Sequence, residues 1–333
     1  MRIDGYDHLT GQHCAATALY NLADFYGWGY DEAACFGYAG GFAQRYPRTD
    51  GRGWRTFTGC EPGLDATFFE TLEIPHLVSE GDAWAAAWDD VTTHLADERP
   101  VLLSVDPTVL PYLMDSTHPG PHVVVAIGYD DRDVVLSDAA SPRLQSLPVD
   151  TLRDAWDLSR PPGWTNRYSV VTRPRHLADE TDAAATATRN VAVHVLRPLE
   201  APRSTAGPGE EGLQALRAFA EDVPTWASLG DPVDALRPAI QAIDWHGEET
   251  ACRGLYAAAL ENLGRRIGLP AAIADRLRDV GEDWRSVREL LEAAATAPDG
   301  DREELLAEAG SRLGDIADRE AAIFQDVDDG LHG

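Results

Sequence analysis

The residue pattern changes character near residue 175, and this change limits the fold more than any other feature of the sequence. Before it, short runs rich in β-branched residues are typical of strands and occupy 101–105, 122–129, 133–138 and 168–171. After it, alanine-rich, leucine-studded segments bounded by Gly or Pro predict helices over 177–195, 211–223, 231–243, 248–267, 270–297 and 301–327. The sequence therefore predicts a mixed domain over residues 1–175 and an all-helical domain over residues 176–333.

The first of these parts is expected to place helices before antiparallel strands. Apolar residues recur at helical spacing over 14–26, where Gly27 ends the pattern, and a second helix is predicted over 82–97. The runs 122–129 and 133–138 are separated by three residues, which predicts a hairpin. Helices followed by hairpin-linked strands indicate the α+β class, because a parallel sheet would need the two to alternate.

The charge balance limits which partners the protein can bind. The chain has 56 acidic and 28 basic residues, every basic residue is arginine, and the formal net charge is -28. Such a field repels polyanions, so we expect neither nucleic acid nor an anionic membrane as a partner. The acid is spread over both parts of the chain, which suggests a halophilic protein in a salty cytosol; an acidic protein of ordinary cytosol is the alternative.

The N-terminal segment, the apolar runs and the cysteine spacing indicate the compartment of the protein and the roles of its cysteines. The N-terminal MRIDGYDH has no signal-peptide character, and no apolar run approaches the ~18–20 residues of a membrane span, so a cytoplasmic protein is expected. The four cysteines include no C-x-x-C pair, which in that compartment predicts neither a disulfide framework nor a zinc site. Cys35 and Cys252 are expected to be packing residues, Cys60 is unassigned, and no cofactor is expected.

Cys14 is the cysteine with the most informative context. It follows Gly11, Gln12 and His13 and begins the helix predicted over 14–26, so its sulfur is expected in the first helical turn. Unpaired backbone N–H groups and the helix dipole favour an anion at that position, which suits a nucleophile. The alternative is a buried cysteine that acts as a small apolar side chain.

His122 and Asp138 are the candidates for a base and its orienting partner. His122 begins an apolar strand directly after Pro121, and Asp138 ends the partner strand of the predicted hairpin. Residue 138 is expected close in register to residue 123, so that its carboxylate reaches the imidazole, where it would fix a tautomer and stabilise an imidazolium. The chain order Cys, His, Asp is that of papain-like enzymes.

These residues lie in segments that resemble a known family. The segment GQHCAATALYNLADFYGWGYDEAACFGYAGGF resembles the N-terminal domain of the butirosin biosynthesis protein H family. The resemblance continues through Gly51 and Arg52, VLLSVDPTVLPY, and HVVVAIGYDD with VVLSDAA. The helical part, in GLQALRAFAEDVPTW and ACRGLYAAAL, resembles the uncharacterised domain that usually follows in that family.

The resemblance implies a papain-like fold and acyl-transfer chemistry in specialised metabolite or antibiotic biosynthesis. The named family member moves an acyl group from an acyl carrier protein thioester to an aminoglycoside amine, which implies a carrier-bound or other thioester donor and a small amine as partners. Cys14 would take the acyl group, His122 would transfer protons, Asp138 would orient His122, and Gln12 would stabilise the oxyanion. Papain-like peptidases place that glutamine about six residues before the cysteine, where this chain has His8.

Three further residues are candidates for contacts with substrate. Arg52, in a glycine-rich loop, is expected to bind a carboxylate or phosphate or to be plain surface charge. Asp106, after a strand, is expected to bind a substrate amine or to begin a turn, and Tyr112 to line the site.

Two alternatives to an acyltransferase stay open at this point. A papain-like cysteine peptidase or amidohydrolase would use the same nucleophile and base, with water replacing the amine. A non-catalytic binding scaffold would need neither, and it predicts that Cys14 and His122 lie far apart.

Overall fold

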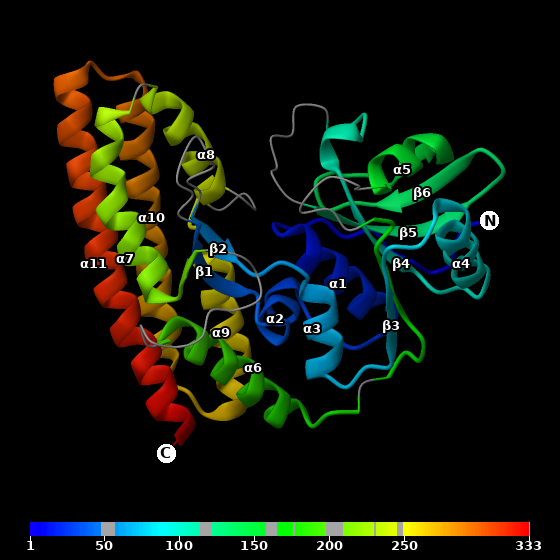
Figure 1. Cartoon of the computed structure of the whole chain (residues 1–333). Helices are drawn as coiled ribbons and strands as arrows, with labels where there is room; N and C mark the ends of the chain where they lie inside the picture. Colours follow the sequence, from blue (N-terminus) through cyan, green and yellow to red (C-terminus); the bar gives the residue numbers. More distant parts are fainter. Residues whose placement is uncertain are drawn as a thin grey trace. The chain divides into compact units, whose positions relative to one another are not determined.

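The chain folds into two compact units, each of which is made from two separate stretches of sequence. The structure is a computed structural model, and it describes residues 1–47, 57–113, 121–157, 165–175, 177–197, 209–229, 231–244 and 249–332 (Figure 1). The first unit consists of Met1–Cys35 and Gly63–Asp179, and the second of Phe36–Pro62 and Glu180–Gly333. The expected division at 175/176 placed residues 36–62 in the first domain, whereas they pack with the second unit.

A six-stranded antiparallel sheet forms the centre of the first unit. In spatial order its strands are β3 (His76–Ser79), β8 (Tyr168–Val171), β4 (Val101–Val105), β5 (His122–Tyr129), β6 (Asp133–Ser137) and β7 (Gln145–Pro148). The predicted hairpin is confirmed as β5 and β6, with Val125 opposite Ser137 and an irregularity between Ala126 and Gly128. Six of the eight residues of β5 are buried, which indicates that both faces of the sheet are covered.

The first unit also contains helices, and both predicted helices of the first part are confirmed. The helices are α1 (Cys14–Phe25), α3 (Leu64–Thr71), α4 (Trp84–Ala96), α5 (Val149–Trp156) and the short 3-10 helix η1 (Pro107–Val109). Helix α1 buries a continuous apolar face against β5, and it ends where Gly27 adopts a positive φ of 69°. This packing fixes the first turn of α1, and therefore Cys14, relative to the sheet.

The second unit is helical, as expected, apart from a small sheet. Its helices are α6 (Glu180–Val195), α7 (Leu213–Asp222), η2 (Val223–Ser228), α8 (Pro232–Asp244), α9 (Arg253–Ile267), α10 (Ala271–Thr296) and α11 (Asp299–His332). Helices α7, α10 and α11 lie side by side (Figure 1), and Pro298 separates the last two because proline disfavours helix in the residue before it. Across the part of the chain that is described, none of the helices is both long and apolar enough to cross a membrane.

The expectation that strands vanish after residue 175 is wrong at one point. Strand β9 (Glu210–Glu211) pairs with β1 (Phe42–Tyr46), which also pairs with β2 (Thr58–Cys60). A two-residue strand carries no period-2 pattern, so only its partner reveals it. Helix α2 (Glu32–Tyr38) contains the point where the chain passes from the first unit to the second.

A buried ion pair explains why β1 belongs to the helical unit. Arg253 and Glu320 are completely buried, and Arg253 Nε lies 2.8 Å from Glu320 Oε1. The guanidinium carbon lies 4.7 Å from the ring centre of Phe42 in β1 and 4.6 Å from that of Trp284. A charge pair tolerates such burial only when partners surround it, so strand and helices are bound together at this point.

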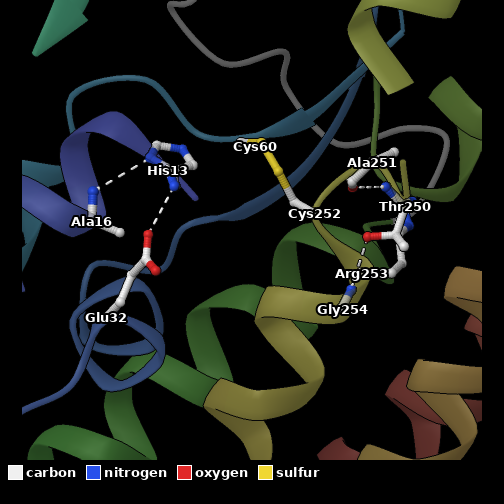
Figure 2. The surroundings of a disulfide bond; sticks show 9 residues. All are labelled: His13, Ala16, Glu32, Cys60, Thr250, Ala251, Cys252, Arg253 and Gly254. Atoms are coloured by element: carbon white, nitrogen blue, oxygen red, sulfur yellow. Dashed lines mark hydrogen bonds between the residues drawn. A yellow bond between two sulfur atoms is a disulfide. The ribbon is translucent and has the colours of Figure 1, made fainter. Parts of the chain in front are cut away.

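A disulfide joins Cys60, at the end of β2, to Cys252, directly before α9 (Figure 2). The expectation that the chain contains no disulfide is therefore wrong, and Cys252 is more than a packing residue. The two cysteines are 192 residues apart in sequence, so no spacing motif signals the bond. Cys14 and Cys35 are free and buried.

The disulfide predicts a definite thiol count. Titration of the unfolded, unreduced chain with a thiol reagent should find two free thiols, and the reduced chain should give four. The double variant Cys60→Ser/Cys252→Ser should lose about 2–4 kcal/mol of unfolding free energy in denaturant. Four free thiols in the unreduced chain would contradict the bond.

Candidate functional site

Cys14 is the first residue of α1, as the sequence predicts. His13 is the N-cap, and its Nδ1 accepts a hydrogen bond from the Ala16 N–H at 3.3 Å. The Cys14 side chain is buried, with 8% of its surface exposed. The thiol therefore lies in the first helical turn and is almost covered by protein.

His122 and Asp138 form a buried hydrogen-bonded pair. His122 is the first residue of β5, Asp138 follows β6, and His122 Nε2 donates to Asp138 Oδ1 over 2.8 Å. Only 5% of His122 and 1% of Asp138 is exposed. Because Val125 lies opposite Ser137, residue 138 falls next to the expected position in the register, and the predicted contact forms.

The imidazole also interacts with the Cys14 side chain, and this contact contributes to its proton affinity together with Asp138. Burial disfavours the charged imidazolium, but hydrogen bonds with Asp138 and with Cys14 outweigh it and raise the pKa of His122 to about 10. Burial also works against the charged form of Asp138, but the bond with His122 prevails and lowers the pKa of that carboxyl. Since Nε2 is bonded to Asp138, the other ring nitrogen, Nδ1, makes the contact with Cys14.

Tyr112 is brought to the same carboxylate. Its hydroxyl donates to Asp138 Oδ2 over 2.8 Å, while the Ala140 N–H donates to Oδ1 over 2.9 Å. Burial and the neighbouring Asp138 charge raise the pKa of the Tyr112 hydroxyl, which therefore stays a donor. Tyr112 thus contacts the orienting carboxylate, a more specific role than lining the site.

The other candidates differ in where the structure places them. The Gln12 side chain is exposed, and its backbone N–H donates to Glu32 Oε1. Asp106 caps η1 by accepting from the Thr108 N–H at 2.9 Å and hydroxyl at 2.6 Å, which fits the turn that was the alternative to amine binding. Arg52 lies outside the described residues.

Two residues at this site escaped prediction. His8 Nε2 donates to the Ser141 carbonyl at 2.9 Å and its Nδ1 is bonded to Ser137 Oγ at 2.7 Å, so His8 holds the turn that carries Asp138. His8 lies six residues before Cys14, where papain-like peptidases have their oxyanion glutamine. Its role here is different, because it holds the turn of Asp138. Glu32, which caps the start of α1 from another helix, has no local signal at all.

The arrangement brings together a thiol, an imidazole and a carboxylate in the order that nucleophilic catalysis requires. The imidazole lies between the other two groups, so it can take the thiol proton while the carboxylate stabilises the resulting cation. A non-catalytic scaffold predicts that Cys14 and His122 lie apart, which is not what is found. No three His, Cys, Asp or Glu side chains of the described residues are placed to hold a metal ion.

Asp138→Asn should lower the pKa of His122 from about 10 toward the ordinary value of about 6.5, because the acceptor charge is lost. An NMR titration of the His122 ring measures this. Asp106→Asn, which alters the carboxylate that caps η1, should leave the pKa of His122 unchanged.

The free energy of unfolding should depend on pH in the direction that these two pKa shifts set. The raised pKa of His122 stabilises the fold at low and neutral pH, and this contribution is lost as the pH rises through about 10. The lowered pKa of Asp138 contributes above about 3.8, and this contribution is lost in acid. The melting temperatures of wild type and Asp138→Asn should therefore differ most near neutral pH. Equal pKa values of His122 in the two proteins would contradict the pairing.

Two family models match consecutive stretches of the chain. The family model described as "Butirosin biosynthesis protein H, N-terminal" matches residues 13–139, which contain Cys14, His122 and Asp138. The model described as "Domain of unknown function (DUF4872)" matches residues 154–327, more than half of the chain.

Solved structures are similar over part of the chain. One of them is the crystal structure of a protein described as a C39-like peptidase from Bacillus anthracis, 15% identical, with a TM-score of 0.39, over 53% of this chain and 98% of that one. Among curated proteins, none matches. The resemblance seen in the sequence is confirmed by the family models: this chain belongs to the family in which the butirosin biosynthesis protein H N-terminal domain is followed by the helical domain DUF4872.

Proposed function

We propose that the protein is a papain-like cysteine acyltransferase that forms an amide from a thioester donor and an amine acceptor. The observation that carries this proposal is the contact between Cys14 and His122, whose other ring nitrogen is bonded to Asp138. The family match supports a role in biosynthesis, since the family is named for a butirosin biosynthesis protein.

The first half-reaction transfers the acyl group to the protein. His122 Nδ1 takes the proton of Cys14, and the raised pKa of His122 means that the imidazole can hold it at neutral pH. The thiolate attacks the donor carbonyl, and the carbon–sulfur bond of the donor breaks as its thiol leaves with the proton from His122. Cys14 is left as a thioester.

The second half-reaction returns the protein to its starting state. Acylation removes the charge on Cys14 that helps to raise the pKa of His122, so the pKa falls and more of the imidazole is neutral and able to accept a proton from the incoming amine. The amine attacks the acyl carbon, its proton passes to His122, the bond to Cys14 breaks, and the Cys14 sulfur takes the proton back from His122. Water in place of the amine gives hydrolysis, the reaction of a peptidase or amidohydrolase.

Cys14→Ala should abolish covalent labelling by a thioester and all turnover, because no other group takes over the nucleophile. Intact-protein mass spectrometry and product analysis measure this. The matched control is Cys35→Ala, which removes the other free cysteine and should keep turnover. An acyl amide formed in the presence of an amine supports transfer, whereas free acid alone supports the hydrolase. Equal labelling of Cys14→Ala and wild type would remove Cys14 from the mechanism.

The net charge of -28 sets a condition on a carrier-bound donor. Acyl carrier proteins are acidic, so docking should improve when salt screens the repulsion. The KM for an acyl carrier protein donor should fall as salt rises from about 0.1 M to about 1 M, while the KM for a small neutral thioester should stay constant. A KM for the carrier that rises with salt would instead indicate docking by opposite charges.

A further inference from the structure

Glu32 holds the segment that carries Cys14 through a single carboxylate oxygen. Its Oε1 accepts from the backbone N–H groups of Gln12 and His13, each at 2.8 Å, and from the Thr17 hydroxyl at 2.7 Å. Figure 2 shows this carboxylate pointing at the backbone of His13. Two of the donors precede Cys14 and the third lies one helical turn after it, so the carboxylate fixes both sides of the nucleophile.

Gly11 shows how closely the carboxylate approaches this segment. A Cβ atom at Gly11 would lie 2.6 Å from Glu32 Oε2 and 2.4 Å from Thr17 Oγ1, distances that real Cβ atoms do not adopt. A side chain at Gly11 would have to displace the Glu32 carboxylate or the Thr17 hydroxyl, so glycine leaves these contacts undisturbed. Glu32 is therefore packed into the turn before α1 and is not a mobile surface charge.

Glu32 also determines which backbone donors stay available beside the sulfur. The start of a helix leaves several N–H groups without intrahelical acceptors. Glu32 takes those of Gln12 and His13, and the His13 ring takes that of Ala16. Within the described part of the chain, the Cys14 N–H has no acceptor, so it is left for the substrate's carbonyl oxygen.

We propose that Glu32 is a positioning residue for the nucleophile: it anchors the turn before Cys14 so that the thiol and the Cys14 N–H are held toward one substrate carbonyl. This role rests on the proposed function. It depends on the acceptor oxygen of Glu32 and not on the negative charge, because a single oxygen makes all three bonds. Donor groups held in place this way act in the transition state more than in substrate binding.

The test compares Glu32→Ala, which removes the acceptor, with Glu32→Gln, which keeps an acceptor oxygen and removes the charge. Turnover of a small thioester is measured and divided by the amount of reactive Cys14, which is counted by labelling a separate sample. Hydrogen exchange of the Gln12 and His13 amides is measured alongside. Glu32→Ala should lower kcat about 10- to 100-fold with little change in KM, and should speed exchange at both amides. Glu32→Gln should keep kcat within about threefold of wild type and keep the amides protected.

Two further variants test the same role if Glu32→Ala folds poorly. Thr17→Val removes one of the three bonds while Glu32 stays in place, and it should lower kcat by less than about 10-fold. Asp31→Asn removes the neighbouring charge but keeps an acceptor for the Ala34 N–H, and should leave kcat unchanged.

Each outcome decides between a positioning role and the alternatives. Faster exchange in Glu32→Ala with unchanged kcat would overturn the positioning role and leave the proposed function intact. A Glu32→Gln variant as slow as Glu32→Ala would show that the charge matters, which also overturns it. Wild-type protein without Cys14-dependent turnover would overturn the proposed function, and the positioning role with it.

Discussion

The buried hydrogen bond between His122 and Asp138 is the interaction on which the site depends. Burial of an imidazolium and a carboxylate is costly unless each has partners, and here Asp138 also accepts from Tyr112 and from the Ala140 backbone. The β5–β6 hairpin sets the two residues within reach, and α1 packs on β5 to bring Cys14 to the same imidazole. The sheet, the β5–β6 hairpin and helix α1 therefore all position groups around the His122 imidazole.

The part of this site that the sequence predicts is the part encoded by local pattern. Cys14 begins a helix with clear apolar spacing, and His122 and Asp138 lie at corresponding ends of two strands joined by a short turn. Each signal occupies fewer than 20 residues, so it can be read along the chain. The α+β class and the helical second part follow from the same kind of evidence.

What the sequence does not predict depends on contacts between distant residues. The Cys60–Cys252 bond, the pairing of β1 with β9 and the burial of Arg253 against Glu320 each join segments more than 60 residues apart. Glu32 is only 18 residues from Cys14, but a glutamate near a helix start is ordinary until its three donors are seen. The disulfide is also unusual for a cytosolic protein, so the cytoplasmic location stays a prediction.

The central claim is that His122 activates Cys14. The most direct test is the rate at which iodoacetamide alkylates Cys14 at neutral pH, compared between wild type and His122→Ala, since it needs no knowledge of donor or acceptor. The substitution should slow alkylation about tenfold or more, because the thiol loses the group that holds its proton. Equal rates in the two proteins would contradict it.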